Sequence, residues 1–232
     1  MNRVLAAARL HLMNPVLTVG IPWGIALLSF CVNLALWATV GVGEESPGAT
    51  TGGVASLYIT VLVVFVQSVT QIMPFAMGMS LSRRTFYLGT ALAAVGVALA
   101  YGAVLAVLAA VEGATGGWGV GLSFWAPGRL DVDNAALQVL VSGAPLLAAA
   151  FLGVAIGVVV KRWGPTGLWS LVVGAILFFG GLAILVSWQR AWGDVGSWLV
   201  AQSVVTLAVA IPLVVVLVTA ALAFAGLRRV VP

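Results

Sequence analysis

The chain has 232 residues, of which 62% are hydrophobic and only 7% are charged. A soluble domain carries about a quarter charged residues, so this composition excludes a water-soluble protein and predicts an all-α integral membrane protein. The net charge of +4 does not indicate nucleic acid as a partner, because the basic residues occur as scattered pairs without a patch. The single cysteine, Cys31, excludes a disulfide within the chain.

Residues 1–14 predict an amphipathic helix that lies along the inner membrane interface and carries Arg3, Arg9 and His11. Its expected apolar face consists of Val4, Leu5, Ala8 and Leu12. The alternative is the basic start of a signal peptide. We disfavour it, because the apolar run that follows is long enough to span a membrane and no small-residue cleavage site ends it.

Residues 15–232 predict a transmembrane domain of six helices, judged against the roughly 20 apolar residues that one span requires. The expected spans cover residues 16–41, 55–79, 88–111, 135–160, 168–188 and 203–227. Between the third and fourth spans lies a longer loop, Gly113–Asn134, which is either an outer cap or a partner surface. The segment Gln189–Leu199 is either a short helix that dips into the outer leaflet or a plain interfacial loop.

Charge predicts the orientation of these spans. Most Lys and Arg residues fall on one side of the six-span arrangement, namely Arg3, Arg9, Arg83, Arg84, Lys161, Arg162, Arg228 and Arg229. Only Arg129 and Arg190 fall on the other side, together with all six acidic residues, among them Glu44 and Glu45. The positive-inside rule therefore predicts a multi-pass protein of the plasma membrane with both termini in the cytoplasm.

The residues that membrane enzymes and pumps require are missing from this sequence. No ionisable side chain lies at the centre of a predicted span, and the only histidine, His11, lies far from Ser142. No Gly-rich phosphate loop with a following Lys and Ser or Thr is present. We therefore expect no catalytic site and no cofactor or metal in this chain, and any ATP hydrolysis must come from another protein.

Several uncharged residues within the spans are open to two interpretations. Asn33, Gln67 and Gln71 are amides that either hydrogen-bond between helices or line a substrate path or a subunit interface. The pair Gly153 and Gly157 permits close helix approach, by default within the subunit. Four prolines are expected to kink or hinge their helices: Pro22, Pro74, Pro145 and Pro212.

A short basic stretch, Gly78-Met79-Ser80-Leu81-Ser82-Arg83-Arg84-Thr85-Phe86-Tyr87-Leu88-Gly89, separates the second and third spans. With the six spans and the basic N-terminal helix, it resembles the permease subunits of type-two, or type V, ABC exporters. The resemblance implies a dimer with a second copy or a related permease, and separate cytoplasmic ATPase subunits that bind ATP and Mg²⁺. It also implies an elbow helix before Pro15 and a coupling helix around Ser82 to Tyr87.

The residues of this turn suit such a contact. Ser82 is a candidate N-cap, so that Arg83, Arg84, Thr85, Phe86 and Tyr87 would form one or two helical turns. The two aromatic rings would enter an apolar groove of the ATPase, and the arginines would meet acidic groups or lipid phosphates. The alternative is that the arginines only satisfy the positive-inside rule and the rings lie in the interface.

The sequence therefore predicts a permease subunit of an ATP-driven exporter. Two other functions remain open: a secondary transporter or channel, and a membrane assembly or sensor subunit that transports nothing. The substrate is not predicted, because an apolar interior with a few amides suits many molecules.

Overall fold

The computed structural model describes residues 3–41 and 50–227. Glu44, Glu45, Arg228 and Arg229 lie outside the described residues, as do both ends of the chain. The described part is helical, and its only bridge between extended residues joins Thr50 to Ser123. Its α-helices are α1 (Arg3–Leu10), α2 (Ile21–Val40), α4 (Ala55–Gln67), α5 (Met73–Gly78), α6 (Arg83–Ala114), α7 (Ala135–Trp188), α8 (Trp192–Ala201) and α9 (Ile211–Leu227). Shorter π and 3-10 segments are η1 (Val16–Gly20), η2 (Ser68–Ile72), η3 (Gly117–Gly121), η4 (Gly128–Leu130) and η5 (Thr206–Ala210).

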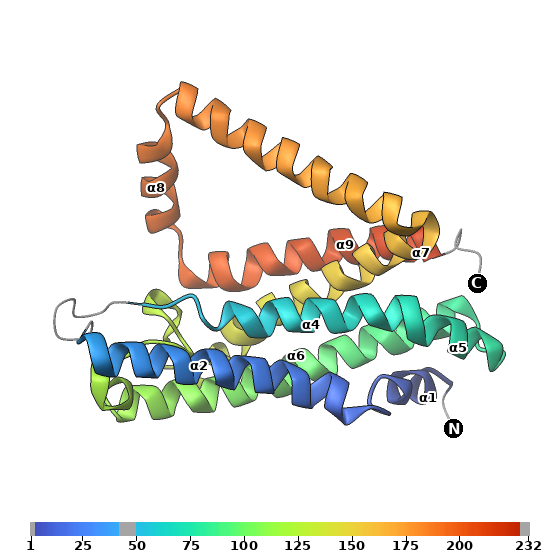
Figure 1. The fold of residues 1–232 in the computed structure, drawn as a ribbon, viewed down its shortest axis with the longest axis horizontal. Coiled ribbons are helices and arrows are strands. Elements are labelled where there is room, and N and C mark those ends of the chain that lie inside the picture. The colour runs from blue at the N-terminus through green and yellow to red at the C-terminus, as the bar shows by residue number, and fades with distance from the viewer. Residues whose placement is uncertain (1–2, 42–49, 228–232) are drawn as a thin grey trace.

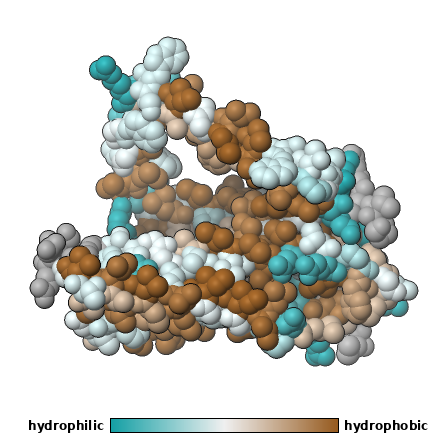
Figure 2. Space-filling view, in the orientation of Figure 1, coloured by the Kyte–Doolittle hydropathy of each residue, from teal (hydrophilic) through white to brown (hydrophobic). Residues whose placement is uncertain are grey.

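Five helical stretches are long and apolar enough to cross a membrane: Val16–Val40, Ala55–Gly78, Arg83–Ala114, Ala135–Trp188 and Thr206–Leu227. The chain is therefore an all-α, multi-pass membrane protein, as its composition predicts. Figure 2 shows that hydrophobic residues cover much of the visible surface of the bundle. Such a surface suits contact with lipid tails, which are as apolar as the side chains.

The predicted fourth and fifth spans belong to one 54-residue element, α7, which bends at Gly164. The backbone angles of Gly164 are φ 63° and ψ −153°, a conformation that is essentially restricted to glycine. We call residues 135–163 the proximal arm and residues 165–188 the distal arm. Figure 1 shows that the chain reverses its direction between them, so the two arms have the lengths and the opposed directions of separate spans.

The proximal arm lies at the centre of the helix bundle, where it packs against α4, α6 and α9. The distal arm leaves the bundle, and with α8 and α9 it forms a three-sided frame (Figure 1). Figure 1 also places α1, α5, the bend of α7 and the last turn of α9 at one end of the molecule, with α8 at the other. The basic pairs Arg83–Arg84 and Lys161–Arg162 thus share one end.

Glycines allow the bundle helices to approach closely. A Cβ atom on Gly153 would lie 2.3 Å from the carbonyl oxygen of Leu62, and one on Gly157 would lie 2.8 Å from the Cβ of Val69. Both distances are shorter than side chains tolerate, so these two positions must be glycine for α7 to pack against α4 and η2. The expectation that this pair packs within the subunit is confirmed.

Three of the four membrane prolines follow π-helical segments. Pro22, Pro74 and Pro212 are each the second residue of an α-helix, and η1, η2 and η5 precede those helices. Proline has no N–H, so the carbonyl four residues earlier loses its α-helical donor. For Pro22 that carbonyl belongs to Thr18, and it accepts a hydrogen bond from the Tyr101 hydroxyl of α6 instead.

The predicted outer loop 113–134 is a folded cap anchored by one buried carboxylate. Glu112, at the end of α6, accepts hydrogen bonds from the backbone N–H of Phe124 (3.0 Å) and of Trp125 (3.2 Å). It also accepts one from the indole N–H of Trp118 at 3.2 Å. These aromatic rings pack around Phe30 of α2, with centroids 5.1 to 5.3 Å away. The loop is therefore folded, and whether it also serves as a partner surface stays a prediction.

Candidate functional site: the turn between α5 and α6

The basic turn is short and strongly bent. The helix α5 ends at Gly78, and Ser80 adopts a left-handed conformation with φ 59°. Ser82 then begins α6, because its side chain accepts a hydrogen bond from the Thr85 N–H at 3.1 Å. The predicted N-cap is confirmed, and Arg83 to Tyr87 are helical as predicted, although they form the first turns of the 32-residue helix α6.

The two aromatic residues of the turn face the protein interior. Phe86 is 0% exposed and packs against His11, with ring centroids 5.8 Å apart. The Tyr87 hydroxyl donates to the carbonyl of Ala220 in α9 at 2.9 Å, and its ring lies 5.2 Å from that of Phe224. The interpretation as an anchor in a groove of another protein is therefore wrong for Phe86, which is fully buried, whereas the half-buried Tyr87 leaves its own interpretation untested.

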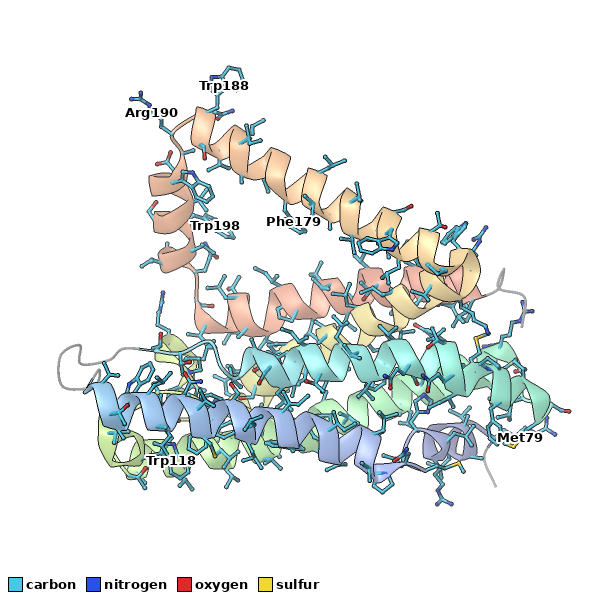
Figure 3. All side chains as sticks on the ribbon, in the orientation of Figure 1. Met79, Trp118, Phe179, Trp188, Arg190 and Trp198 are labelled. Atoms are coloured by element: carbon cyan, nitrogen blue, oxygen red, sulfur yellow. The ribbon has the colours of Figure 1, made fainter. Side chains whose placement is uncertain are left out.

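The surface of the turn is formed by other residues. Met79 is 50% exposed and lies at the end of the bundle in Figure 3, and Ser80, Ser82 and Arg84 are exposed as well. Arg83 and Thr85 are half-buried, and the Thr85 hydroxyl lies 2.8 Å from that of Ser82. The exposed surface of the turn thus consists of the Met79 thioether, the hydroxyls of Ser80 and Ser82, and the positively charged guanidinium of Arg84.

The predicted N-terminal helix is present as α1, and it packs against α6. Its buried residues are Ala7 and Ala8, and the contact is close because a Cβ on Gly89 of α6 would lie 2.5 Å from that of Ala7. Of the predicted apolar face, Leu5 and Leu12 are exposed, whereas Ala8 is buried against the bundle. Small residues approach the neighbouring backbone, while the leucines point outward.

His11 links α1 to the first turns of α6 and was not predicted to have a structural role. Its Nδ1 lies within hydrogen-bond distance of the Ala7 carbonyl at 3.3 Å, and its Nε2 lies 3.1 Å from the Thr90 hydroxyl, which itself donates to the Phe86 carbonyl at 3.0 Å. Burial lowers the pKa of His11 below its ordinary value of 6.5, although the backbone groups of Ala7 and Ala8 partly oppose this. The neutral imidazole is thus a packed part of the contact, and a lone histidine at helical spacing from alanines was its only sequence signal.

The three predicted amides do not form one path. Asn33 donates to the Ser29 carbonyl at 2.8 Å and accepts from the Thr51 hydroxyl at 2.7 Å, so it fixes the chain that enters α4. Gln67 is half-buried at the end of α4. Gln71 is exposed in η2 and borders a cavity that neither of the other two lines. The structure thus favours a bonding role for Asn33 and separates it from Gln71.

The segment 189–199 contains a helix, α8, at the end opposite the turn (Figure 1). Arg129 of the outer cap donates to the carbonyls of Val200 at 2.7 Å and Gln202 at 3.3 Å. A cation at a helix C-terminus also stabilises the helix dipole. Trp188 and Arg190 mark the corner of the frame in Figure 3, and Trp188 is 83% exposed.

Comparisons of this chain with protein-family models, with curated proteins and with solved structures find no match. The likeness to exporter permeases therefore rests on the residues of the turn and on the arrangement of the helices. The exposed side chains of the turn are the basis for the function proposed next.

Proposed function

We propose that this chain is the permease subunit of an ATP-driven exporter and that the turn Met79–Arg84 receives the movement of a separate cytoplasmic ATPase. One observation carries the proposal. The turn presents an exposed, mixed surface, while Phe86 and Tyr87, shortly after it, contact His11 and α9. A push on the turn would therefore reach helices at both ends of the chain.

In this proposal the chain crosses the plasma membrane six times, with the turn and both termini in the cytoplasm. The bend at Gly164 supports the count, because it gives α7 two arms of opposite direction. The orientation is supported by the basic residues gathered at one end, as the positive-inside rule requires. The exposed Leu5 and Leu12 would place α1 in the inner interface as an elbow helix.

Single cysteines test this topology in a Cys31→Ser background. We expect Ser80→Cys and Thr166→Cys to react with a membrane-impermeant maleimide only from the cytoplasmic side, and Arg190→Cys only from the outside. Labelling of the cysteines at 166 and 190 from the same side would contradict the crossing of the membrane by the distal arm.

The energy for transport would come from ATP and Mg²⁺ bound by the partner ATPase. Closure of the ATPase would displace Met79 to Arg84, and Tyr87 would pass the displacement to α9 through Ala220. The π-helical segments before Pro22, Pro74 and Pro212 are places where the helices can change shape, since π segments and prolines weaken the regular hydrogen-bond ladder.

A second copy of the chain, or a related permease, would pack against the distal arm of α7. Gly174, Gly180 and Gly181 of this arm have no neighbouring atom within 4 Å of a would-be Cβ, unlike Gly153 and Gly157 of the proximal arm. Small residues mediate close contact between membrane helices, because lipid supplies no hydrophobic driving force for association. These glycines support the distal arm as the subunit interface.

Charge reversal at the turn tests the coupling role. We expect Arg84→Glu to reduce co-purification with a Walker-motif ATPase and to lower transport-coupled ATP hydrolysis about tenfold, since contacts of this kind depend on Arg anchors. Arg84→Lys should retain most of the activity. The matched control is Arg190→Glu, which makes the same charge change at the opposite end of the molecule.

Equal loss in Arg84→Glu and Arg190→Glu would show that the effect is general and would contradict the assignment. Transport by the purified chain alone, without an ATPase, would contradict the proposal and favour a secondary transporter or channel. Complex formation without any export would favour an assembly or sensor subunit.

A further inference from the structure

A cavity of about 290 Å³ lies between the end of α1 and the helices α4 and η2. Its deep part is lined by buried residues, including Val61, Phe65 and His11. At its edge are exposed residues: Leu12, Met13, Asn14, Gln71 and Phe75. The volume is at the small end of the range for ligand pockets, and the lining is mostly apolar with a few polar groups, as such pockets usually are.

One polar atom in the wall has no partner. Ser68 is 2% exposed, and its hydroxyl makes no hydrogen bond within the described part of the chain. A serine in a membrane helix ordinarily bonds to a backbone carbonyl one turn earlier. Ser68 begins the π-helical segment η2 and does not make that bond. An unsatisfied buried hydroxyl is costly. The Ser68 oxygen is covered by neighbouring atoms, so the side chain must turn toward the cavity before a ligand group there can restore the lost hydrogen bond.

Apart from the exposed amide of Gln71 at the edge, the other polar side chains of the lining are already paired. His11 is held by Ala7 and Thr90, and Asn14 accepts from the Leu17 N–H at 3.3 Å through its side chain. The carbonyl of Thr18 is taken by Tyr101. Among the described residues that line the cavity none is Asp, Glu, Lys or Arg, so an ionic group would find no counter-charge.

From the unpaired hydroxyl, the apolar walls and the lack of charge, we propose that this cavity binds a neutral amphiphile with a single hydroxyl or amide head. The head hydrogen-bonds to Ser68, and the aliphatic body lies along Val61, Phe65 and Val97. Such a molecule enters past Leu12 and Phe75, two exposed apolar residues at the edge. Binding at this site needs no ATPase, so the result of its test is independent of the proposed exporter function.

Photolabelling tests the site in the full chain, purified in phosphatidylcholine nanodiscs. The probe is octanol that carries a diazirine, and mass spectrometry locates the label. We expect the label on the peptides around 10–18 and 61–75, and we expect unlabelled octanol to compete at least fivefold better than octane, which has the same chain without the hydroxyl. Label spread evenly over the lipid-facing helices, or equal competition by octane, would overturn the proposal.

Two pairs of variants separate binding from misfolding. Val97→Phe fills the cavity and should abolish the local label, whereas Val95→Phe, on the same helix but outside the lining, should leave it unchanged. Ser68→Ala should weaken octanol competition about fivefold and leave octane unaffected, while Ser170→Ala on the distal arm should change neither. Persistent labelling of a correctly folded Val97→Phe protein would overturn the proposal.

The source of the natural ligand follows from a further competition. Dioleoylglycerol added to the nanodisc has one free hydroxyl and should displace the probe if the occupant is a neutral membrane lipid. Displacement by short alcohols alone would assign the site to small amphiphiles that enter from the aqueous side. Either result supports a hydroxyl-recognising site, and failure of both to displace the probe would contradict it.

Discussion

Single polar side chains hold separate parts of this protein together. Glu112 joins α6 to the folded loop 113–134, His11 joins α1 to α6, and the half-buried Tyr87 joins α6 to α9. Glu112 and His11 are buried, so water competes little for their bonds. Removal of one of these side chains should therefore loosen one junction and leave the rest of the bundle intact.

Glu112 is the sharpest case, because its carboxylate serves three donors. We expect Glu112→Ala to lower the free energy of unfolding by about 3 kcal/mol, since hydrogen bonds to a charged group are lost and the N–H groups of Phe124 and Trp125 stay buried. Thermal unfolding in nanodiscs would measure the loss, and limited proteolysis would locate it in residues 113–134. Asp133→Ala, an exposed acid of the same loop, should change neither and is the control.

His11 makes the junction of α1 sensitive to pH. Its pKa in the folded protein lies below 6.5 because of burial, so the unfolded chain binds the proton more readily. The contribution of the neutral His11 to the free energy of unfolding is therefore fully present above about pH 6.5. It is lost as the pH falls from 6.5 through the pKa of the folded protein. We expect the melting temperature to fall between pH 7 and pH 5 in the native protein and to fall less in His11→Phe. An equal fall in both would assign the pH dependence to other groups.

At the scale of residues, the sequence predicts local hydrogen bonding better than the direction in which a side chain points. The N-cap role of Ser82 follows from local backbone geometry and was predictable. The inward direction of Phe86 was not, because it depends on His11 and Phe65 from distant segments. Glu112 looked like an ordinary outer acid, since its partners lie 12 and 13 residues later in a segment without a regular pattern.

The elements of this fold are fixed where glycine brings two backbones together. Gly153 of α7 lies against Leu62 of α4, and Gly102 of α6 lies against Val139 and Gly143 of α7. The distal arm of α7 has no such contact at Gly174. Glycine therefore supports helix packing at Gly102 and Gly153, whereas a side chain at Gly174 would meet nothing within the chain.

A matched pair of substitutions tests this difference. Gly153→Val should lower the stability of the subunit by about 3 kcal/mol, because the new Cβ collides with the Leu62 backbone and the helices must separate. Gly174→Val should leave subunit stability within about 0.5 kcal/mol, as for other substitutions away from packed sites. Unfolding of the detergent-solubilised monomer would measure both, and equal losses would contradict the packing seen at Gly153.

The apolar runs of the sequence predicted the helices, but not where each one begins and ends. The third span was expected from residue 88, whereas α6 begins at Arg83 and includes the basic stretch. The expected fourth and fifth spans left residues 161–167 between them, but the helix is interrupted only at Gly164. Hydropathy reports which residues avoid water, and it does not distinguish a helical turn from a loop when both are short.

The whole molecule consists of a packed bundle and an open frame. Phe179 of the distal arm and Trp198 of α8 extend toward the interior of the frame in Figure 3, where they meet little of their own chain. The frame is held at its corners by the bend at Gly164 and by the bonds of Arg129 to the end of α8. These two corners fix the position of the arm relative to the bundle.

If the distal arm is the subunit interface, its glycines should govern association. We expect Gly180→Val to lower the dimer fraction at least tenfold while the melting temperature of the monomer stays unchanged, because the new side chain meets nothing within the subunit. Disulfide cross-linking through Phe179→Cys in a Cys31→Ser background would report the dimer. An unchanged cross-linking yield would contradict the interface.

The open frame also determines which changes the chain can accept over evolutionary time. A side chain that touches only lipid can be exchanged for any other apolar residue, since fluid tails adapt to its shape. Residues 135–163, enclosed by three helices, cannot be exchanged so freely. Related sequences should therefore drift fastest along residues 165–188, except on whichever stripe of the arm is held by another protein, and a library of apolar replacements would reveal that stripe directly.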